Sequence, residues 1–162
     1  KENIALAPLT TMRVGGPARF FATIADEKEL ADALYFAEEK GARYFVLGEG
    51  SNILVADTGL SGLVLKFSAS AVTLEDYPNG RALLIAEAGA HWDDAVAIAV
   101  SKNLHGLENL SLIPGTIGAA SVQNIGAYGA ELADTLLWAD VFDTRVKKET
   151  RLSKNECGFS YR

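Results

Sequence analysis

The sequence contains few of the residues that build disulfides and metal centres. It has one cysteine, Cys157, and two histidines among 162 residues. A single cysteine cannot form an internal disulfide, which fits a reducing compartment. Cys157 has no histidine near it in sequence, which favours a small core residue over a nucleophile. The histidines and the cysteine also lack the spacing of metal ligands, so we expect no metal site.

Basic clusters and long apolar runs are absent as well. The formal net charge is −6, and lysines and arginines do not cluster, which argues against a nucleic-acid or anionic-membrane partner. No apolar run reaches the ~20 residues of a membrane span. Residues 1–10 lack the apolar core and cleavage site of a signal peptide. An anionic ligand would therefore be held by backbone groups or by a few arginines.

What the chain does contain is a long segment that is rich in glycine and poor in charge. Residues 106–129 include five glycines and one proline, and Glu108 is their only charged side chain. Glycine weakens regular strands and helices, but it lets a backbone wrap closely around a ligand. Nests of backbone N–H groups bind phosphate without a basic side chain. The alternative is a buried loop between two core elements, although long charge-free loops are usually functional.

The first part of the chain shows a strand, a helix and a second strand. Arg19–Ile24 is rich in aromatic and β-branched residues and predicts a strand. Asp26 and Glu29 form the pattern of a capping box that opens a helix, and Gly41 predicts its left-handed end. Tyr44–Leu47 is a short apolar strand. This order predicts a right-handed βαβ unit.

A glycine-rich turn, Gly48–Asn52, follows the second strand directly. Open α/β units bind ligands at the carboxyl ends of their parallel strands. Ser51 and Asn52 would add short polar groups to the backbone donors. The spacing is neither the G-x-G-x-x-G fingerprint nor a P-loop, and Ile53–Val55 after it predicts a strand. A plain tight turn explains the same residues equally well.

The rest of the chain predicts a second α+β unit that begins near Phe67. We expect a first subdomain at 1–67 and a second at 68–162. A strand expected at Gly62–Phe67 completes the first subdomain. The expected elements of the second are strands at Ala71–Glu75 and Arg81–Ala88 around a turn at Pro78–Gly80, a helix at Trp92–Leu104, and a hairpin of Thr135–Asp143 and Arg145–Leu152. Ser153 and Glu156 form another capping box, which predicts a very short helix.

Six motifs together resemble one family of flavoenzymes, the UDP-N-acetylenolpyruvoylglucosamine reductases, also called UDP-N-acetylmuramate dehydrogenases. They occur in the family's order over essentially the whole chain. The motifs are Thr11-Met-Arg-Val-Gly-Gly-Pro-Ala, Leu47-Gly-Glu-Gly-Ser-Asn-Ile-Leu, Gly106-Leu-Glu-Asn-Leu, Ile113-Pro-Gly-Thr-Ile-Gly-Ala, Gln123-Asn-Ile-Gly-Ala-Tyr-Gly and Cys157-Gly-Phe-Ser-Tyr-Arg.

The resemblance implies a fold, a cofactor and a reaction. The fold is α+β, the two-subdomain FAD-binding fold of the vanillyl-alcohol-oxidase-like (PCMH-type) flavoproteins, with FAD between the subdomains. NADPH would deliver hydride to the flavin, and flavin N5 would pass it to UDP-N-acetylglucosamine enolpyruvate. The product, UDP-N-acetylmuramate, serves peptidoglycan synthesis and therefore cell-wall formation, cell shape and division. The resemblance also implies a cytoplasmic protein.

The same resemblance assigns site residues. Arg162 would stabilise the enolate that develops on the substrate, since a fixed guanidinium suits a planar carboxylate. Tyr128, Tyr161 and Arg162 would bind substrate, and no residue would bind a metal. The residues expected to bind FAD are Gly48, Glu49, Gly50, Ser51, Asn52, Gly115, Thr116, Gly118, Ala119, Ala120, Gln123, Ile125 and Gly126.

One departure from the family concerns length. Family members continue past the Tyr-Arg position into the last strands of the second subdomain. A third domain follows, which supplies a serine proton donor and a second-shell glutamate. We therefore expect the chain to be a portion that binds FAD and is inactive alone. The alternatives are another vanillyl-alcohol-oxidase-like oxidoreductase, or a non-catalytic nucleotide-binding module.

Overall fold

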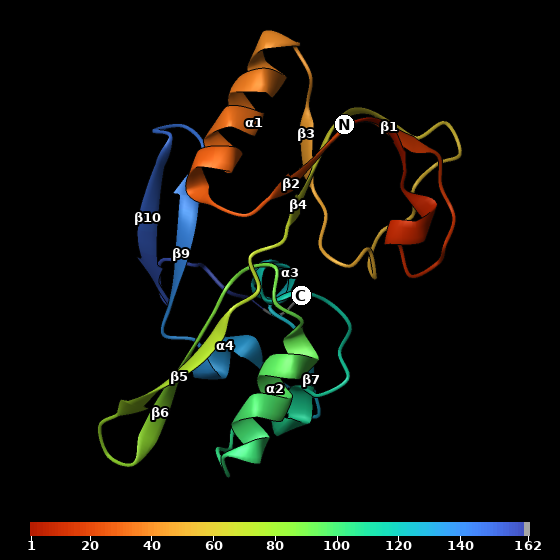
Figure 1. Cartoon of the computed structure of the whole chain (residues 1–162). Helices are drawn as coiled ribbons and strands as arrows, with labels where there is room; N and C mark the ends of the chain where they lie inside the picture. Colours follow the sequence, from red (N-terminus) through yellow and green to blue (C-terminus); the bar gives the residue numbers. More distant parts are fainter. Residues whose placement is uncertain (161–162) are drawn as a thin grey trace. The chain divides into compact units, whose positions relative to one another are not determined.

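The computed structural model describes residues 1–160 and shows two compact units, Lys1–Ala69 and Ser70–Arg162 (Figure 1). Each unit combines helices with strands, which confirms the predicted α+β class. Tyr161 and Arg162 lie outside the described residues. No described helix has the length and apolar character needed to cross a membrane.

The first unit is built on a four-stranded sheet. Its order is β1 (Glu2–Ala5), β2 (Pro17–Ile24), β4 (Leu60–Phe67) and β3 (Tyr44–Val46). Strand β1 runs antiparallel to β2, whereas β4 runs parallel to both β2 and β3. The two strands of the predicted βαβ unit are therefore parallel but not adjacent, because β4 lies between them.

Helix α1 (Glu27–Glu39) packs on β2 and β4 of this sheet (Figure 1). The Asp26 carboxylate accepts the Glu29 N–H at 2.8 Å, so the predicted N-cap is confirmed. The Glu29 carboxylate accepts the N–H of Ala25 at 2.7 Å, one residue further back than a standard capping box. Gly41, with φ +57°, ends the helix as expected.

The remaining backbone of the first unit forms loops around the end of the sheet. A short 3₁₀ helix, η1 (Ala7–Leu9), follows β1. Ile53–Val55, expected to be a strand, is irregular, because these residues belong to the loop that leads back to β4. Val55 nevertheless lies in the core. That core contains the buried residues Leu6, Ala18, Phe21, Leu47, Val55 and Val64.

The second unit contains two longer hairpins, one near each end of its sequence. Strands β5 (Val72–Tyr77) and β6 (Arg81–Ala86) pair around Asn79 and Gly80, whose φ angles are +64° and +69°. Strands β9 (Trp138–Asp143) and β10 (Lys148–Ser153) form the other hairpin. Strand β9 begins later than the predicted Thr135, because helix α4 (Leu132–Thr135) takes the preceding residues.

Two helices and one small hairpin form the centre of the second unit. Helix α2 (Trp92–Ser101) ends before the predicted Leu104, and Asn103 adopts a left-handed φ of +56° just after it. The segment 106–129, expected to lack regular structure, contains η2 (Glu108–Leu110), α3 (Ile117–Gln123) and the start of the hairpin formed by β7 (Gly126–Ala127) and β8 (Ala130–Glu131). Small side chains allow this compact folding. The buried core residues are Trp92, Val96, Leu110, Ala120 and Leu132.

Candidate functional site

The first glycine-rich turn, Gly48–Asn52, follows β3 and rests on the loop after η1. Gly50 is buried with φ +68°. A Cβ at this position would lie 2.5 Å from the carbonyl oxygen of Leu9 and 2.8 Å from the Cα of Thr10. The carbonyl of Gly50 accepts the Thr11 N–H at 3.2 Å. Only glycine fits such a close backbone contact in this conformation.

This turn presents backbone donors next to a positive charge. Within residues 1–160, the N–H groups of Gly48 and Gly50 have no hydrogen-bond acceptor. The Lys66 ammonium donates to the carbonyl of Gly48 at 2.8 Å and forms no ion pair with a described residue. A lysine held against a turn with two available N–H groups favours an anion there. Of the other residues of the turn, Glu49 and Ser51 are half-buried and Asn52 is exposed.

The second candidate segment begins at Gly115 in the second unit. Gly115 accepts the Trp92 N–H at 3.0 Å, which ties the segment to the start of α2. The N–H groups of Ile117 and Gly118 donate to Ala90 and Ala88, each at 2.9 Å. These two N–H groups therefore already have acceptors within the chain.

At the start of this segment, the backbone N–H groups of Gly115 and Thr116 are the ones still available to a ligand. Neither N–H has an acceptor among the described residues, although both residues are buried. Gly115 has φ +145°, and a Cβ there would meet no atom within 4 Å. The segment thus resembles the first turn, since it offers backbone N–H groups from a glycine-containing bend. The described residues contain no cluster of three or more His, Cys, Asp or Glu side chains that could hold a metal ion.

The residues of helix α3 that are expected to bind cofactor differ in how far they are buried. Ala119 and Gly118 are half-buried. A Cβ at Gly118 would lie 3.1 Å from the Cβ of Ala88. The Ala120 side chain lies in the core, its N–H donates to Thr116, and its carbonyl accepts the N–H of Ile125 at 3.2 Å. Ala120 therefore supports the fold of the segment, and its polar groups are already used.

The residues after α3 lead to the tip of the small hairpin. Gln123 is exposed, Ile125 packs against the core, and Gly126 pairs with Glu131. Tyr128, expected to bind substrate, is 90% exposed at the turn between β7 and β8. Tyr161 and Arg162, the other substrate residues, fall outside the described part of the chain.

Sequence reasoning missed Asn124, which caps the end of α3 with a left-handed φ of +42°. The residue is buried, and its side-chain amide makes three hydrogen bonds, with Glu131, Ala133 and Ser160. Asparagine at the end of a short helix is a signal for the left-handed cap. Nothing in the sequence predicts its partners, one of which is 36 residues away.

An acidic side chain fixes the loop just before Gly115. The Asp93 carboxylate accepts the Ser111 hydroxyl at 2.8 Å and the Leu112 N–H at 2.7 Å. The Leu112 N–H and, second, the Ser111 hydroxyl lower the pKa of Asp93 below its usual value. Leu112 itself adopts a left-handed φ of +62°, so these contacts hold a strained bend against the start of α2.

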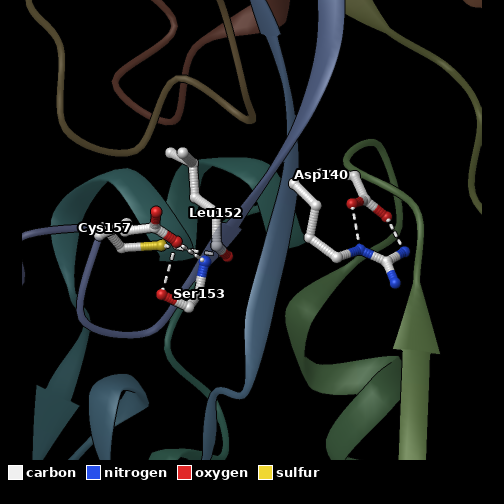
Figure 2. A network of polar contacts seen from close by, with 6 residues as sticks. Asp140, Leu152, Ser153 and Cys157 are labelled. Atoms are coloured by element: carbon white, nitrogen blue, oxygen red, sulfur yellow. Dashed lines mark hydrogen bonds and ion pairs between the residues drawn. The ribbon is translucent and has the colours of Figure 1, made fainter.

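The turn that follows β10 closes the described chain. The Ser153 N–H and hydroxyl donate to the Glu156 carboxylate at 2.9 and 2.6 Å. The predicted capping contact is therefore present, but residues 154–158 form turns and the predicted short helix is absent. Cys157, expected to be a core residue, is only half-buried, and its Sγ lies 3.9 Å from the carbonyl of Leu152 (Figure 2).

Comparison with known proteins places this architecture among flavoproteins. The FAD binding domain family matches residues 18–146. The chain is 44% identical to the UDP-N-acetylenolpyruvoylglucosamine reductase of Saccharopolyspora erythraea and 38% identical to that of Thermobifida fusca. These matches cover 98% and 99% of this chain, but only 43% and 45% of the relatives. The chain thus spans less than half the length of these curated relatives.

A solved structure agrees with the sequence matches. This chain is 32% identical in sequence to the crystal structure of UDP-N-acetylenolpyruvylglucosamine reductase (MurB) from Thermus caldophilus, and the two folds superpose with a TM-score of 0.79. The superposition covers 99% of this chain and 55% of the Thermus caldophilus chain. The available N–H groups of Gly48 and Gly50, and separately those of Gly115 and Thr116, are donors of the kind that bind an anionic group such as a phosphate. On the family match over most of its length, the chain belongs to the FAD binding domain family.

Proposed function

We propose that the chain is the FAD-binding portion of an NADPH-dependent reductase of peptidoglycan synthesis. The enzyme would convert UDP-N-acetylglucosamine enolpyruvate to UDP-N-acetylmuramate in the cytoplasm. One observation carries this proposal: the similarity to reductases of this name runs along almost the whole chain. A general nucleotide-binding module would not be expected to match one enzyme so evenly.

The chain's own groups have distinct roles in this proposal. The N–H groups of Gly48 and Gly50 would donate to phosphate oxygens of FAD, and those of Gly115 and Thr116 are a second set of donors that the resemblance assigns to the cofactor. The Lys66 ammonium would add positive charge beside the first pair. Backbone donors fixed by surrounding contacts need no reorganisation when an anion binds. The Asp93 contacts would keep the bend before Gly115 in this arrangement.

The other residues expected from the resemblance act on cofactor and substrate. Bound FAD would supply the chemistry that transfers hydride from NADPH to the enolpyruvyl double bond. Arg162 would stabilise the charge that develops on the substrate carboxylate, since a guanidinium pairs with a carboxylate in a fixed plane. Tyr128 and Tyr161 would contact the substrate. Residues expected to complete the FAD site are Glu49, Ser51, Asn52, Gly118, Ala119, Ala120, Gln123, Ile125 and Gly126.

We expect Lys1–Arg162 alone to bind FAD without turning over substrate. In the family that the chain resembles, the proton donor belongs to a third domain. Loss of a general acid costs roughly 10²–10⁴-fold in rate. Activity is therefore tested in a chimera, with residues 1–162 in place of the matching part of the Saccharopolyspora erythraea relative.

The experiment separates the proposal from its alternatives. Flavin absorbance of the purified chain after loading with FAD distinguishes a flavoprotein from another nucleotide-binding module. NADPH oxidation by the chimera that depends on UDP-N-acetylglucosamine enolpyruvate supports the proposed reaction. Flavin binding with NADPH oxidation that ignores this substrate would instead favour another oxidoreductase of the same fold.

A further inference from the structure

Asn124 is a buried polar side chain whose amide makes three hydrogen bonds. Its Oδ1 accepts the Ala133 N–H at 3.0 Å. Its Nδ2 donates to the Glu131 carboxylate at 2.8 Å and to the Ser160 carbonyl at 3.1 Å. The orientation of the amide is fixed, because a backbone N–H can only donate and a carbonyl can only accept.

These contacts join three parts of the second unit at one side chain. Asn124 itself ends α3, which carries residues expected to hold FAD. Glu131 and Ala133 lie at the beginning of α4. Ser160 lies in the tail that leaves the β9–β10 hairpin and is the last residue that the structure describes. The amide thus links the end of α3 to the backbone directly before Tyr161.

The other end of this tail is also fixed. Arg151 on β10 forms two hydrogen bonds of 2.7 Å with Asp140 on β9, and its guanidinium lies over the Trp138 ring at 4.6 Å. Ser153 and Glu156 then close the turn after β10. Between this turn and Asn124 the tail spans only residues 157–160. Its two anchors therefore fix residues 157–160 at both ends.

We propose that Asn124 is a positioning residue for Arg162, acting through the carbonyl of Ser160. The inference rests on the proposed function, in which the Arg162 guanidinium stabilises the enolate. Such stabilisation depends on a charge held in place before the reaction. Misplacement by about 1 Å can cost on the order of 10²-fold in rate. Asn124 would thus couple the geometry of the cofactor-binding segment to that of the proposed catalytic arginine.

An exchange of groups between positions 124 and 131 is directed at the Ser160 contact. In the double variant Asn124→Asp with Glu131→Gln, the new carboxylate still accepts the Ala133 N–H. The amide introduced at position 131 donates to the same carboxylate, so the 124–131 contact is kept with its direction reversed. The total charge is unchanged. The Ser160 carbonyl, however, loses its donor and faces a carboxylate oxygen, which repels it.

Two other variants complete the design. Glu131→Gln alone keeps Asn124 and its bond to Ser160, because the glutamine oxygen can accept from Nδ2, and it is the matched control. Asn124→Gly removes the whole amide but accepts the left-handed φ of +42° without strain. It serves as a second test if the double variant does not fold.

The variants are measured in the chimera described above. We expect the double variant to fold and to keep its FAD affinity near that of the Glu131→Gln control, with a lower melting temperature because the Ser160 carbonyl has lost its donor. Its kcat should fall on the order of 10²-fold. If Asn124 acts through Arg162, the same exchange added to Arg162→Lys should cause no further loss, because the misplaced group is already impaired.

Each result decides the matter. A folded, FAD-loaded double variant that turns over like the control overturns the inference. The inference is also overturned if the fold-losses in kcat of the exchange and of Arg162→Lys multiply when combined, since the two positions would then act independently. If neither the double variant nor Asn124→Gly folds, Asn124 serves stability and the positioning role is rejected. An unmutated chimera without substrate-dependent activity overturns the proposed function itself, and the inference with it.

Discussion

The Lys66 ammonium lies 2.8 Å from the carbonyl oxygen of Gly48, although Lys66 belongs to β4 and Gly48 follows β3. The parallel register of the two strands, which pairs Val46 with Leu65, brings them together. The contact orients the peptide of Gly48 and leaves two ammonium hydrogens for another partner, because an ammonium has three donors. A positive charge beside available N–H groups is the arrangement that an anion requires.

Loss of this charge should weaken FAD binding. We expect Lys66→Met to raise the Kd for FAD about tenfold, the effect of losing one charge-assisted hydrogen bond. Lys28→Met removes the same charge from an exposed position on α1 and is the control. Fluorescence titration at two salt concentrations measures both. Equal affinity in the two variants would exclude a role for Lys66 in anion binding.

The close contact at Gly50 predicts a large stability difference between two glycine variants. Gly50 and Gly41 both have left-handed φ angles, +68° and +57°, but a Cβ at Gly41 meets nothing within 4 Å. Gly41→Ala should therefore cost only backbone strain, about 1 kcal/mol. Gly50→Ala adds a clash with the Leu9–Thr10 backbone and should cost at least about 2 kcal/mol more. Urea denaturation measures the free energy of unfolding of both variants. Similar values would mean that the Gly50 turn and the Leu9–Thr10 backbone move apart at little cost.

The contact of Gly118 changes what a bulky substitution there should do. Its glycine-rich setting alone suggests that Gly118→Val removes FAD while the fold persists. The structure instead places Ala88 3.1 Å from the added Cβ, with its carbonyl oxygen at 3.2 Å. We therefore expect Gly118→Val to lower the free energy of unfolding by about 1–3 kcal/mol and to weaken FAD binding as well. Thermal denaturation without FAD tests this. An unchanged Tm would instead support the expectation that the substitution removes FAD and leaves the fold intact.

The Asp93 contacts predict an acid-dependent contribution to stability. The pKa of the Asp93 carboxyl is lowered in the folded state, mainly by the Leu112 N–H. A lowered pKa stabilises the fold above the unfolded value of 3.8, and this gain is lost as pH falls through the folded pKa. Asp93→Asn should thus be less stable than the parent at pH 7, and the gap should narrow below about pH 4.

A neighbouring carboxylate provides the control for this experiment. Asp94 also lies in the first turn of α2 and has no contact with the Ser111–Leu112 bend among the described residues. Denaturation with urea from pH 7 down to about pH 3 follows both variants. An Asp93→Asn gap that stays constant with pH, or one that Asp94→Asn reproduces, would contradict the assignment.

The sequence predicts local features well because neighbouring residues determine them. Asp26 caps α1, Gly41 ends it, and Asn79 with Gly80 turns the β5–β6 hairpin, each through contacts within a few residues. The sequence also predicts the glycine turn at Gly48, at the end of a strand. Each of these signals depends on backbone conformations that particular residue types favour.

Distant contacts could not be predicted in the same way. Strand β4 lies between β2 and β3, and only this order brings Lys66 to Gly48. Asn124 reaches Ser160 because the β9–β10 hairpin returns the chain to α3. The small residues of 106–129 suggest irregular backbone, yet Gly118 allows α3 to pack against Ala88. Tertiary contacts override local glycine preferences at these positions.

The most direct test of the account is the binding of FAD and riboflavin to the chain, measured by flavin fluorescence. Riboflavin carries the flavin ring but lacks the pyrophosphate and the adenosine of FAD, so it separates binding through the flavin from binding through the rest of the cofactor. We predict saturable binding of one FAD per chain and riboflavin binding that is weaker by at least about 100-fold, the loss of roughly two charge-assisted hydrogen bonds. Absence of FAD binding, or riboflavin binding as tight as that of FAD, would contradict the central claim that these glycine-rich segments hold the pyrophosphate.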